Sequence, residues 1–453
     1  MRGNMKSLTK GKPIKVILLF AVPLYVGQLF QLGYSLIDTR IIGGILGEKA
    51  LAAVGATISL SDMLTEFLNG IICGFGIIIS TFFGSEDEEG LKKAIGGSVV
   101  LGVAGTMFIS GLSSAFLPDI LRILNISDEL LPQAAAYIRI ILCGLLATTL
   151  YNICAAVLRA IGDSYTPLIF LVISNLMNIF LDYVCILKLR MGVSGAAFAT
   201  IISQALSAFC CFLYMKKKYP GICLSGRDFL PDKEIWKRLL PTGLSMGFMI
   251  SFVTLGSLAL QTSINTFGTN IIVAHTAARK ATSLFLIPFF VLSSALATYC
   301  GQNLGAKEYG RIQKGIRDTI LLSFIWCVAA LLMVFTLSPT IIRAITASAE
   351  SEVVDTASLY LKINAVFYFL PAVICILRNS MQGFGDTKTP LASSLIELAG
   401  KVLIAYLLAP FIGYMGVMIS EPVVWAFMVI PLLIGTMRNP IWRAVSSTDS
   451  GNL

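Results

Sequence analysis

The sequence predicts an all-α membrane protein of twelve transmembrane helices, arranged as two pseudo-symmetric lobes of six. Its composition is the first reason, because 56% of residues are hydrophobic and 13% are charged, against roughly 25% charged in a soluble domain. Apolar runs recur along the whole chain, and each has the roughly 20 residues needed to cross a bilayer as a helix. Motifs of the first half also return in the second half at nearly constant spacing.

Twelve segments are expected to span the membrane, each bounded to within about four residues. They are 14–46, 49–84, 91–117, 133–158, 165–188, 193–215, 236–267, 271–303, 316–337, 355–382, 390–411 and 414–438. Several exceed the required length, so we expect them to tilt, bend or project beyond the bilayer. The basic start of the chain leads into a long apolar run without a small-residue cleavage site, so no signal peptide is expected.

The basic residues predict the orientation. The N-terminus, the even-numbered connections and the C-terminus hold 23 of the 34 Lys and Arg residues, and the other side holds 7. Four more lie inside spans: Arg40, Arg279, Lys280 and Lys401. Because basic residues are retained on the cytoplasmic side, both termini are expected there. The net charge of +9 is therefore a topology signal, and no water-soluble basic domain exists to bind nucleic acid.

Four regions are expected along the chain. The N-terminal lobe covers 1–215, a polar cytoplasmic linker covers 216–235, the C-terminal lobe covers 236–438, and a cytoplasmic tail covers 439–453. The linker is the longest connection and contains two prolines, Pro220 and Pro231, and two glycines, Gly221 and Gly226.

The two lobes repeat one another. RAIGDSYTP at 159–167 matches QGFGDTKTP at 382–390 with a separation of 223 residues, and MGVSG at 191–195 matches MGVMI at 415–419 with a separation of 224. Each half has an even number of spans, so the halves are parallel repeats, related by an axis along the membrane normal. A repeat of this kind predicts a substrate site between the lobes.

These motifs carry a family resemblance. The chain resembles the multidrug and toxic compound extrusion (MATE) transporters in LRAIGDSYTP, in QGFGDTKTP, in LGEKALAAVG after the first span, and in GQNLGAKEYGRI after the eighth. The match covers essentially residues 15–435. The resemblance implies a V-shaped pair of six-helix lobes around a cavity that faces each side in turn, and exchange of H⁺ or Na⁺ for cationic, often aromatic, drugs.

The resemblance also implies a cation site in the N-terminal lobe, as in one prokaryotic branch of the family. The residues that match that pattern are Gln31 and Asp38 on the first helix, Asn178 and Asp182 on the fifth, and Thr200 on the sixth. Another branch has a carboxylate on the seventh helix. Here that stretch, LPTGLSMGFMISF, has no acid, so a Na⁺ site of that type in the C-terminal lobe is not expected.

Depth in the membrane supports the same site independently. Asp38, Asn178, Asp182 and Thr200 all lie about 9–15 Å below the expected outer boundary at about 1.5 Å per residue. Asn178 and Asp182 share a helix face because they are four residues apart. Two close carboxylates cannot both ionise cheaply, so one can carry a proton, while the same oxygen set can also ligate Na⁺. Alternatively, the two aspartates are helix-end groups that reach interfacial water.

Asp62 and Glu66 form an acidic pair, four residues apart, inside the second span. Charged residues inside a span are costly and are functional candidates by default. Either they take part in ion coupling, or they line a surface that attracts cations.

Two further pairs with the same spacing lie in the second half. Glu397 and Lys401 are expected to form an internal ion pair, with a substrate-facing role as the alternative. His275 and Arg279 either face a pore or lie at a wetted outer helix end.

Other candidates are weaker. Pro23 removes a backbone hydrogen bond in the first span and is a candidate hinge. A set of Met and aromatic residues either lines a flexible apolar pocket or serves in simple packing and lipid contact. This set is Tyr34, Met63, Phe67, Met177, Tyr183, Met246, Met249 and Phe252.

The function expected from these features is secondary antiport that exports amphipathic organic cations, drugs or metabolites, in exchange for H⁺ or Na⁺ by alternating access. A lipid-linked precursor flippase of the same superfamily is the alternative, although it should have a more basic cavity. A channel fits the repeat less well. An enzyme is not expected, because the chain has one histidine and lacks HExxH and GxSxG with a partner.

The remaining expectations concern partners and location. No cofactor is expected, and no metal ion beyond Na⁺ as a coupling ion. The ten cysteines contain no CxxC pair and lie mostly in apolar spans, which is typical of small core residues. We expect a monomer in the cytoplasmic (inner) membrane, with small organic cations and the lipid bilayer as its partners and no nucleic acid.

Overall fold

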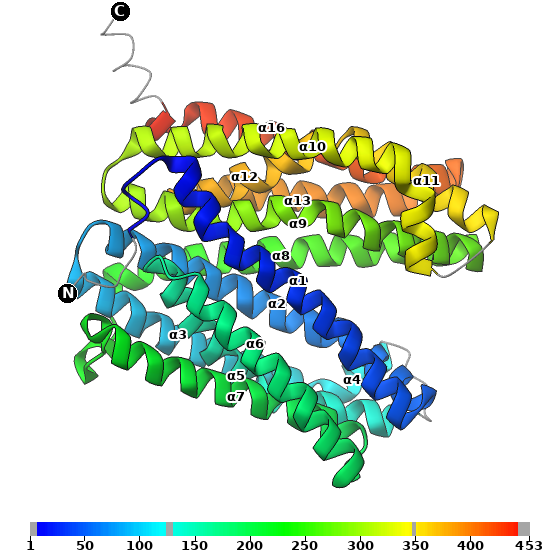
Figure 1. The fold of residues 1–453 in the computed structure, drawn as a ribbon, viewed down its shortest axis with the longest axis horizontal. Coiled ribbons are helices and arrows are strands. Elements are labelled where there is room, and N and C mark those ends of the chain that lie inside the picture. Colours follow the sequence, from blue (N-terminus) through cyan, green and yellow to red (C-terminus); the bar gives the residue numbers. More distant parts are fainter. Residues whose placement is uncertain (1–6, 124–129, 347–349, 443–453) are drawn as a thin grey trace, which may run out of the picture. The chain divides into compact units, whose positions relative to one another are not determined.

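The computed structural model describes residues 7–123, 130–346 and 350–442, and these ranges fold into helices without a β-strand (Figure 1). The helices of the first half are α1 (Pro13–Leu46), α2 (Glu48–Gly84), α3 (Glu88–Ala115), α4 (Leu117–Ile123), α5 (Leu131–Ala160), α6 (Tyr165–Asp182) and α7 (Val193–Lys218). Those of the second half are α8 (Lys233–Ile264), α9 (Thr269–Gly305), α10 (Tyr309–Thr346), α11 (Ser351–Val366), α12 (Phe369–Gly383), α13 (Lys388–Leu403), α14 (Ala409–Ile412), α15 (Tyr414–Met418) and α16 (Ser420–Arg438).

The predicted fold class is confirmed. Eleven segments of the described chain are long and apolar enough to cross a membrane, and α11 with α12 forms a twelfth that is bent by 57°. The main difference from prediction is length, because α10 has 38 residues where a span of 316–337 was expected. Two spans also continue through π-helical segments, Tyr183–Lys188 after α6 and Ile404–Leu408 after α13.

The chain divides into two compact units. One contains 22–247, and the other contains 8–21 together with the chain from Phe248 onward. The packing units therefore differ from the sequence repeat in two places. The first turns of α1 belong to the second unit, and the chain changes units inside α8 at Gly247. In α1 the change falls between Ala21 and Val22, beside Pro23.

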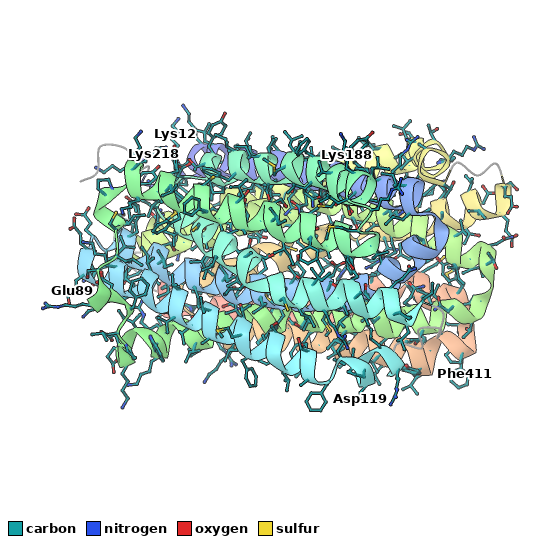
Figure 2. All side chains as sticks on the ribbon, turned by 90° about the horizontal axis from the view of Figure 1, so that it is seen from below. Lys12, Glu89, Asp119, Lys188, Lys218 and Phe411 are labelled. Atoms are coloured by element: carbon teal, nitrogen blue, oxygen red, sulfur yellow. The ribbon has the colours of Figure 1, made fainter. Side chains whose placement is uncertain are left out.

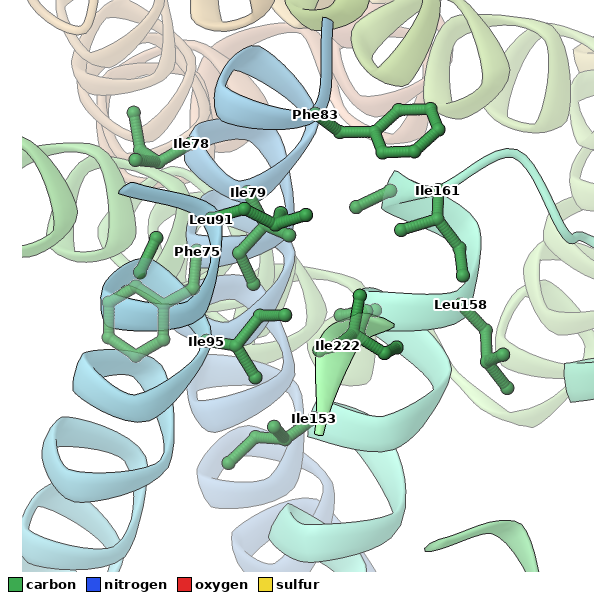
Figure 3. Packing of buried hydrophobic residues seen from close by; sticks show 14 of the residues in the cluster. Phe75, Ile78, Ile79, Phe83, Leu91, Ile95, Ile153, Leu158, Ile161 and Ile222 are labelled. Atoms are coloured by element: carbon green, nitrogen blue, oxygen red, sulfur yellow. The ribbon is translucent and has the colours of Figure 1, made fainter. Parts of the chain in front are cut away.

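In the first unit, α5 is the central helix and packs against α2, α3 and α7. Its buried face supplies Ile153, Val157 and Leu158 to an apolar cluster with Phe75 and Ile79 of α2 (Figure 3). In Figure 2, Glu89 and Lys218 lie at one end of this unit's helices, and Asp119 lies at the other end. This arrangement follows the predicted alternation of connections, and it places the polar helix ends apart from the apolar middle.

A glycine contact joins α2 to the first half of α8. Gly70 and Gly74 on α2 face Gly247 and Gly243 on α8, so both helices present glycines four residues apart. A Cβ atom on Gly74 would lie 2.7 Å from the Gly243 Cα atom and 2.6 Å from the Thr242 carbonyl oxygen. Only small residues let two membrane helices approach this closely.

In the second unit, α9 packs against α10, α11 and α12, while α13 packs against α16. The start of the chain is tied to this unit by polar contacts. The Leu8 backbone N–H donates to Gln302 Oε1 at 2.8 Å, and Arg311 Nη1 donates to the Gly11 carbonyl at 2.8 Å.

The two repeated G-D-x-x-T-P turns have the same geometry. Asp163 accepts hydrogen bonds from the Thr166 backbone N–H at 3.0 Å and hydroxyl at 2.6 Å. Asp386 accepts the same two bonds from Thr389, at 3.1 and 2.7 Å. The glycines before these aspartates have positive φ, 87° and 93°, which other residues rarely adopt. Each aspartate thus satisfies the start of the helix that carries its unit's polar residues.

Asp163 has additional partners outside the turn. Tyr219 donates its hydroxyl hydrogen bond to Asp163 Oδ2 at 2.6 Å, and Lys218 Nζ lies 3.3 Å away. Burial by itself would raise the pKa of Asp163, but the bonds from Thr166 and Tyr219 and the Lys218 charge hold that pKa below its usual value.

The predicted linker, 216–235, lies entirely within the described residues. It contains two short 3₁₀ turns, Pro220–Ile222 and Gly226–Phe229, and both pack against α3. Ser225 and Asp228 cap the second turn, and the Ser225 backbone hydrogen bond lowers the pKa of Asp228.

Candidate functional site

Three helices of the first unit bring together four of the five predicted cation-site residues. Asp38 lies on α1, Asn178 and Asp182 lie on α6, and Thr200 lies on α7. Asn178 and Asp182 are buried, with 2% and 0% of their surfaces exposed. Their spacing of four residues places both side chains on the same face of α6, next to α7.

Asn178 links these helices. Its side-chain amide hydrogen-bonds the hydroxyl of Tyr34 on α1. With its NH₂ group turned toward the carboxylate, the amide donates to Asp182 Oδ2 at 3.1 Å and accepts from the Thr200 backbone N–H at 3.0 Å. This orientation gives the amide the largest number of hydrogen-bond partners, and the orientation of an amide is assigned from its hydrogen-bond network.

The carboxyl groups of Asp38 and Asp182 lie within hydrogen-bonding reach of each other. Two carboxyl groups approach this closely at low cost only when they share a proton or when a cation neutralises them. The second oxygen of Asp182, Oδ1, is buried and has no hydrogen-bond partner among the described residues. Buried polar atoms are normally paired, so the arrangement can hold a proton or a small cation.

Gln31 lies outside this cluster, on an exposed part of α1 two turns before Asp38. Tyr137 of α5 was missed by the sequence analysis. It interacts electrostatically with both Asp38 and Asp182. Nothing in the local sequence around Tyr137 distinguishes it from other tyrosines in apolar spans, so only the packing of α5 identifies it.

The acidic pair on α2 has a different environment. Asp62 and Glu66 are exposed on the surface of the chain. Glu66 hydrogen-bonds Asn69 one turn further along α2. Ionised carboxylates exposed to lipid at this depth would be costly, so an exposed pair indicates contact with water or with cations.

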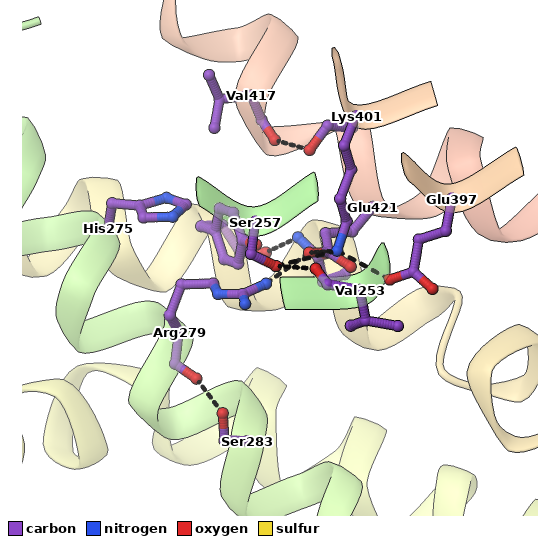
Figure 4. A network of polar contacts seen from close by, with 12 residues as sticks. Val253, Ser257, His275, Arg279, Ser283, Glu397, Lys401, Val417 and Glu421 are labelled. Atoms are coloured by element: carbon purple, nitrogen blue, oxygen red, sulfur yellow. Dashed lines mark hydrogen bonds and ion pairs between the residues drawn. The ribbon is translucent and has the colours of Figure 1, made fainter. Parts of the chain in front are cut away.

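The second unit contains a ladder of five charged side chains. Figure 4 shows its members Arg279, Glu397, Lys401 and Glu421. From one end to the other the order is Arg378, Glu397, Lys401, Glu421 and Arg279. Arg378 lies 3.4 Å from Glu397, which lies 3.0 Å from Lys401. Lys401 lies 3.5 Å from Glu421, and Glu421 pairs with Arg279. Charges therefore alternate along the ladder, as buried charges require.

The predicted ion pair of Glu397 and Lys401 is present, but it is part of this larger ladder. Arg378 and Glu421 were missed as partners, although both are ionisable residues inside apolar segments. His275 is buried, with 3% of its surface exposed, and its Nδ1 lies 3.1 Å from the Tyr414 hydroxyl. The wetted helix end expected as one alternative for His275 is therefore wrong.

The apolar candidates fall into two groups. Met246 and Met249 are buried in α8, with 6% and 7% exposed. Tyr183 is exposed, and partly exposed positions are occupied by Tyr34, Met63, Phe67, Met177 and Phe252. Their role as pocket residues stays a prediction.

Comparisons with known proteins bear on the whole chain. A model of the MatE family matches residues 23–184 and again 246–407, once in each half. The probable multidrug resistance proteins YpnP and YoeA of Bacillus subtilis are 29% and 28% identical to it. These matches cover 86% of both chains for YpnP, and 94% of this chain and 93% of the relative for YoeA. A crystal structure of MATE in the bent conformation superposes with a TM-score of 0.86 at 23% identity, over 98% of each chain.

Proposed function

Because the chain belongs to the MatE family of multidrug efflux transporters, we propose that it exports amphipathic organic cations in exchange for H⁺ or Na⁺ by alternating access. The observation that carries the proposal is the close pair of Asp38 and Asp182, with Asn178 and Tyr34 bound against it. A group that loads and releases an ion must bind it better in one access state than in the other. Paired carboxyl groups on two different helices meet this need, because a small helix movement changes their separation.

H⁺ is the coupling ion favoured here. Two carboxyl groups in hydrogen-bonding contact are already arranged to share one proton. Na⁺ requires several oxygen ligands, and the carboxylates, the Asn178 amide and the Thr200 hydroxyl supply a set of this type. The unpaired Asp182 Oδ1 atom suits either ion.

Cationic cargo is supported by the exposed acids on α2. Asp62 and Glu66 place two acidic side chains at an exposed position inside a membrane segment. An amphipathic cation would gain both electrostatic attraction and apolar contact beside them. The relatives that are named as probable multidrug resistance proteins agree with a broad cargo range.

The two access states need a flexible element, and Pro23 is the proposed hinge. Proline removes one helix hydrogen bond and tolerates bending. It adjoins the point where α1 passes from one packing unit to the other, and α1 carries Asp38 further along. Bending there would move Asp38 relative to Asp182 on α6.

The proposed setting is the cytoplasmic membrane, with both termini inside and the protein acting as a monomer. The charge bias of the connections supports this orientation. In a variant without the ten native cysteines, a cysteine introduced at position 225 should be labelled from the cytoplasmic side only. Labelling in intact cells by a membrane-impermeant reagent would reverse the assignment.

Uptake of a fluorescent organic cation into inverted vesicles tests the coupling, with a pH gradient and a Na⁺ gradient applied separately. Asp38→Asn and Asp182→Asn should each abolish gradient-driven uptake and leave thermal stability and cargo binding intact. Asp119→Asn, at an exposed position of α4, is the matched control and should transport normally. Normal transport by Asp38→Asn would remove this site and make Asp62 and Glu66 the leading candidates. Transport of a lipid-linked anion in place of cations would favour the flippase.

A further inference from the structure

The interface between α6 and α7 continues from the candidate ion site toward the end of the first unit that is cytoplasmic in the proposed orientation. The two helices pack against each other (Figure 1). Two hydrogen bonds fix their register. The Asn178 amide accepts from the Thr200 backbone N–H at 3.0 Å, and the Ser207 hydroxyl donates to the Phe170 carbonyl at 3.4 Å. The stretch between these two contacts is therefore an antiparallel pairing of 170–178 with 200–207.

Polar residues occupy the middle of this stretch on both helices. Ser174 is four residues before Asn178, so the two side chains share one face of α6. Gln204 is four residues after Thr200 and three before Ser207, so these three side chains share one face of α7. Because both ends of the stretch are fixed, Ser174 and Gln204 lie at the same level, about 6 Å below Asn178 along the helix.

Three polar atoms at this level are buried without a hydrogen-bond partner among the described residues. They are Ser174 Oγ, the neighbouring Asn175 Nδ2, and Gln204 Oε1. Ser174 and Asn175 have 1% and 4% of their surfaces exposed. Buried polar groups are normally paired, and internal water supplies the partner where the protein offers none. A hydroxyl, an amide N–H and a carbonyl oxygen together provide the donors and acceptors that bound water needs.

Polar side chains also connect this level with the exposed end of the helices. Ser207 is buried, and Tyr214 lies seven residues further along α7 on the same face. The Tyr214 hydroxyl accepts a hydrogen bond from Lys218 Nζ at 2.7 Å, and Lys218 lies 3.3 Å from Asp163. Polar groups therefore follow one another from the ion site to the ends of α6 and α7.

We propose that this interface holds a chain of water molecules that conducts H⁺ from the paired carboxyl groups to the cytoplasm, with Ser174, Asn175 and Gln204 as its water-binding residues. The proposal rests on the proposed function with H⁺ as the coupling ion. A proton leaves the Asp182 carboxyl group, each water accepts one proton and passes one on, and the last water releases one to the cytoplasmic solvent. Polar residues inside membrane spans mark proton routes of this kind.

The test uses purified full-length protein in liposomes under a pH gradient. A trapped pH-sensitive dye reports H⁺ flux, and a fluorescent organic cation reports cargo flux. Asn175→Leu and Gln204→Met nearly keep the side-chain volume and remove the water-binding group. Each should slow H⁺ flux by about 3- to 10-fold, since the barrier rises by the range of one hydrogen bond. Cargo affinity should stay within about twofold, because the packing is kept.

The rate ratio between H₂O and D₂O separates a proton route from a packing defect. It should rise in both variants, because proton transfer then limits the rate. Slower flux with an unchanged ratio would indicate a structural effect and overturn the proposal, as would normal flux in both variants.

Ser98→Ala is the matched control for Ser174→Ala. Ser98 lies on α3, is 1% exposed, and donates to the Ala94 carbonyl of its own helix at 2.6 Å. Ser174→Ala should slow H⁺ flux and raise the isotope ratio, and Ser98→Ala should do neither. The same change in both would overturn the proposal. Absence of cargo transport under a pH gradient in the wild-type protein would instead reject the proposed coupling to H⁺, and it is measured before any variant is compared.

Discussion

Replacing Glu421 by Gln should strongly destabilise the second unit, because it removes one of the two anions of the charged ladder. Glu421 is 6% exposed, pairs with Arg279 and lies 3.5 Å from Lys401. The neutral amide would leave three cations against Glu397 alone. Removing one partner of a buried ion pair costs about 3–5 kcal/mol, because the remaining charge stays buried.

Arg279→Gln is the informative comparison. It removes a cation, so the ladder becomes neutral and Glu421 keeps Lys401 as a partner. The cost should be about 1 kcal/mol, because the Arg279 side chain is 38% exposed and its pairing is weakened by solvent. The double variant Glu421→Gln with Arg279→Gln returns to a net charge of +1. It should therefore be more stable than Glu421→Gln alone.

Thermal unfolding of the four purified proteins in one detergent measures this order. The expected sequence of midpoints is wild type, then Arg279→Gln, then the double variant, then Glu421→Gln. The cycle should give a favourable coupling of about 1–3 kcal/mol, typical of residues in one network. Additive effects, or a double variant less stable than Glu421→Gln, would refute the charge argument.

Three more predictions concern the first unit. Asp163→Ala should lower stability by about 1.5–3 kcal/mol in urea unfolding, and Asp386→Ala by less, since only turn bonds are found for Asp386 among the described residues. Because the folded pKa of Asp163 is depressed, its contribution should be present above about pH 4 and lost as pH falls further. Gly74→Ala should cost about 1–3 kcal/mol through overpacking against α8, whereas Gly105→Ala, with open space around it, should not destabilise. Tyr137→Phe should slow gradient-driven transport severalfold at unchanged thermal stability, because Tyr137 interacts electrostatically with both paired carboxyl groups; normal transport would exclude it from the ion site.

The sequence predicted the cluster in the first unit because its geometry is local or set by depth. Asn178 and Asp182 share a helix face through their spacing alone. Asp38 and Thr200 were expected at the same depth in the membrane, because the rise per residue of a helix converts a distance from the span boundary into a depth. Gln31 entered the predicted site through the family pattern alone, and it lies on an exposed part of α1. A family pattern identifies the helix that carries a residue and not the direction of its side chain.

The ladder in the second unit was only partly predictable. Glu397 and Lys401 are four residues apart on one helix, so their pairing follows from local geometry. Arg378, Glu421 and Arg279 come from three other helices, and their pairing depends on how α9, α12 and α16 pack around α13. Arg378 lies near the end of α12, where a basic residue is also typical of a cytoplasmic helix end.

The repeat shows that shared architecture has acquired different chemistry. With the separation of 223 residues between the G-D-x-x-T-P turns, Ser174 and Asn178 correspond to Glu397 and Lys401, and Asp182 corresponds to Ala405. The helices that carry them start from the same aspartate-capped turn and continue into the same kind of π-helical segment. Helix geometry is therefore retained while the polar side chains on one face are exchanged.

This difference in side chains gives the two units different electrostatic properties. The first unit has carboxyl groups that contact each other and lack a basic partner in the described cluster, so an exchangeable ion has to neutralise them. In the second unit the equivalent face carries acids that are already neutralised by permanent cations, and such a site has little reason to exchange protons. A coupling site in both units would require Lys401 to be replaced by a neutral residue and a carboxylate to be added at position 405. The asymmetry therefore argues for ion coupling through the first unit alone.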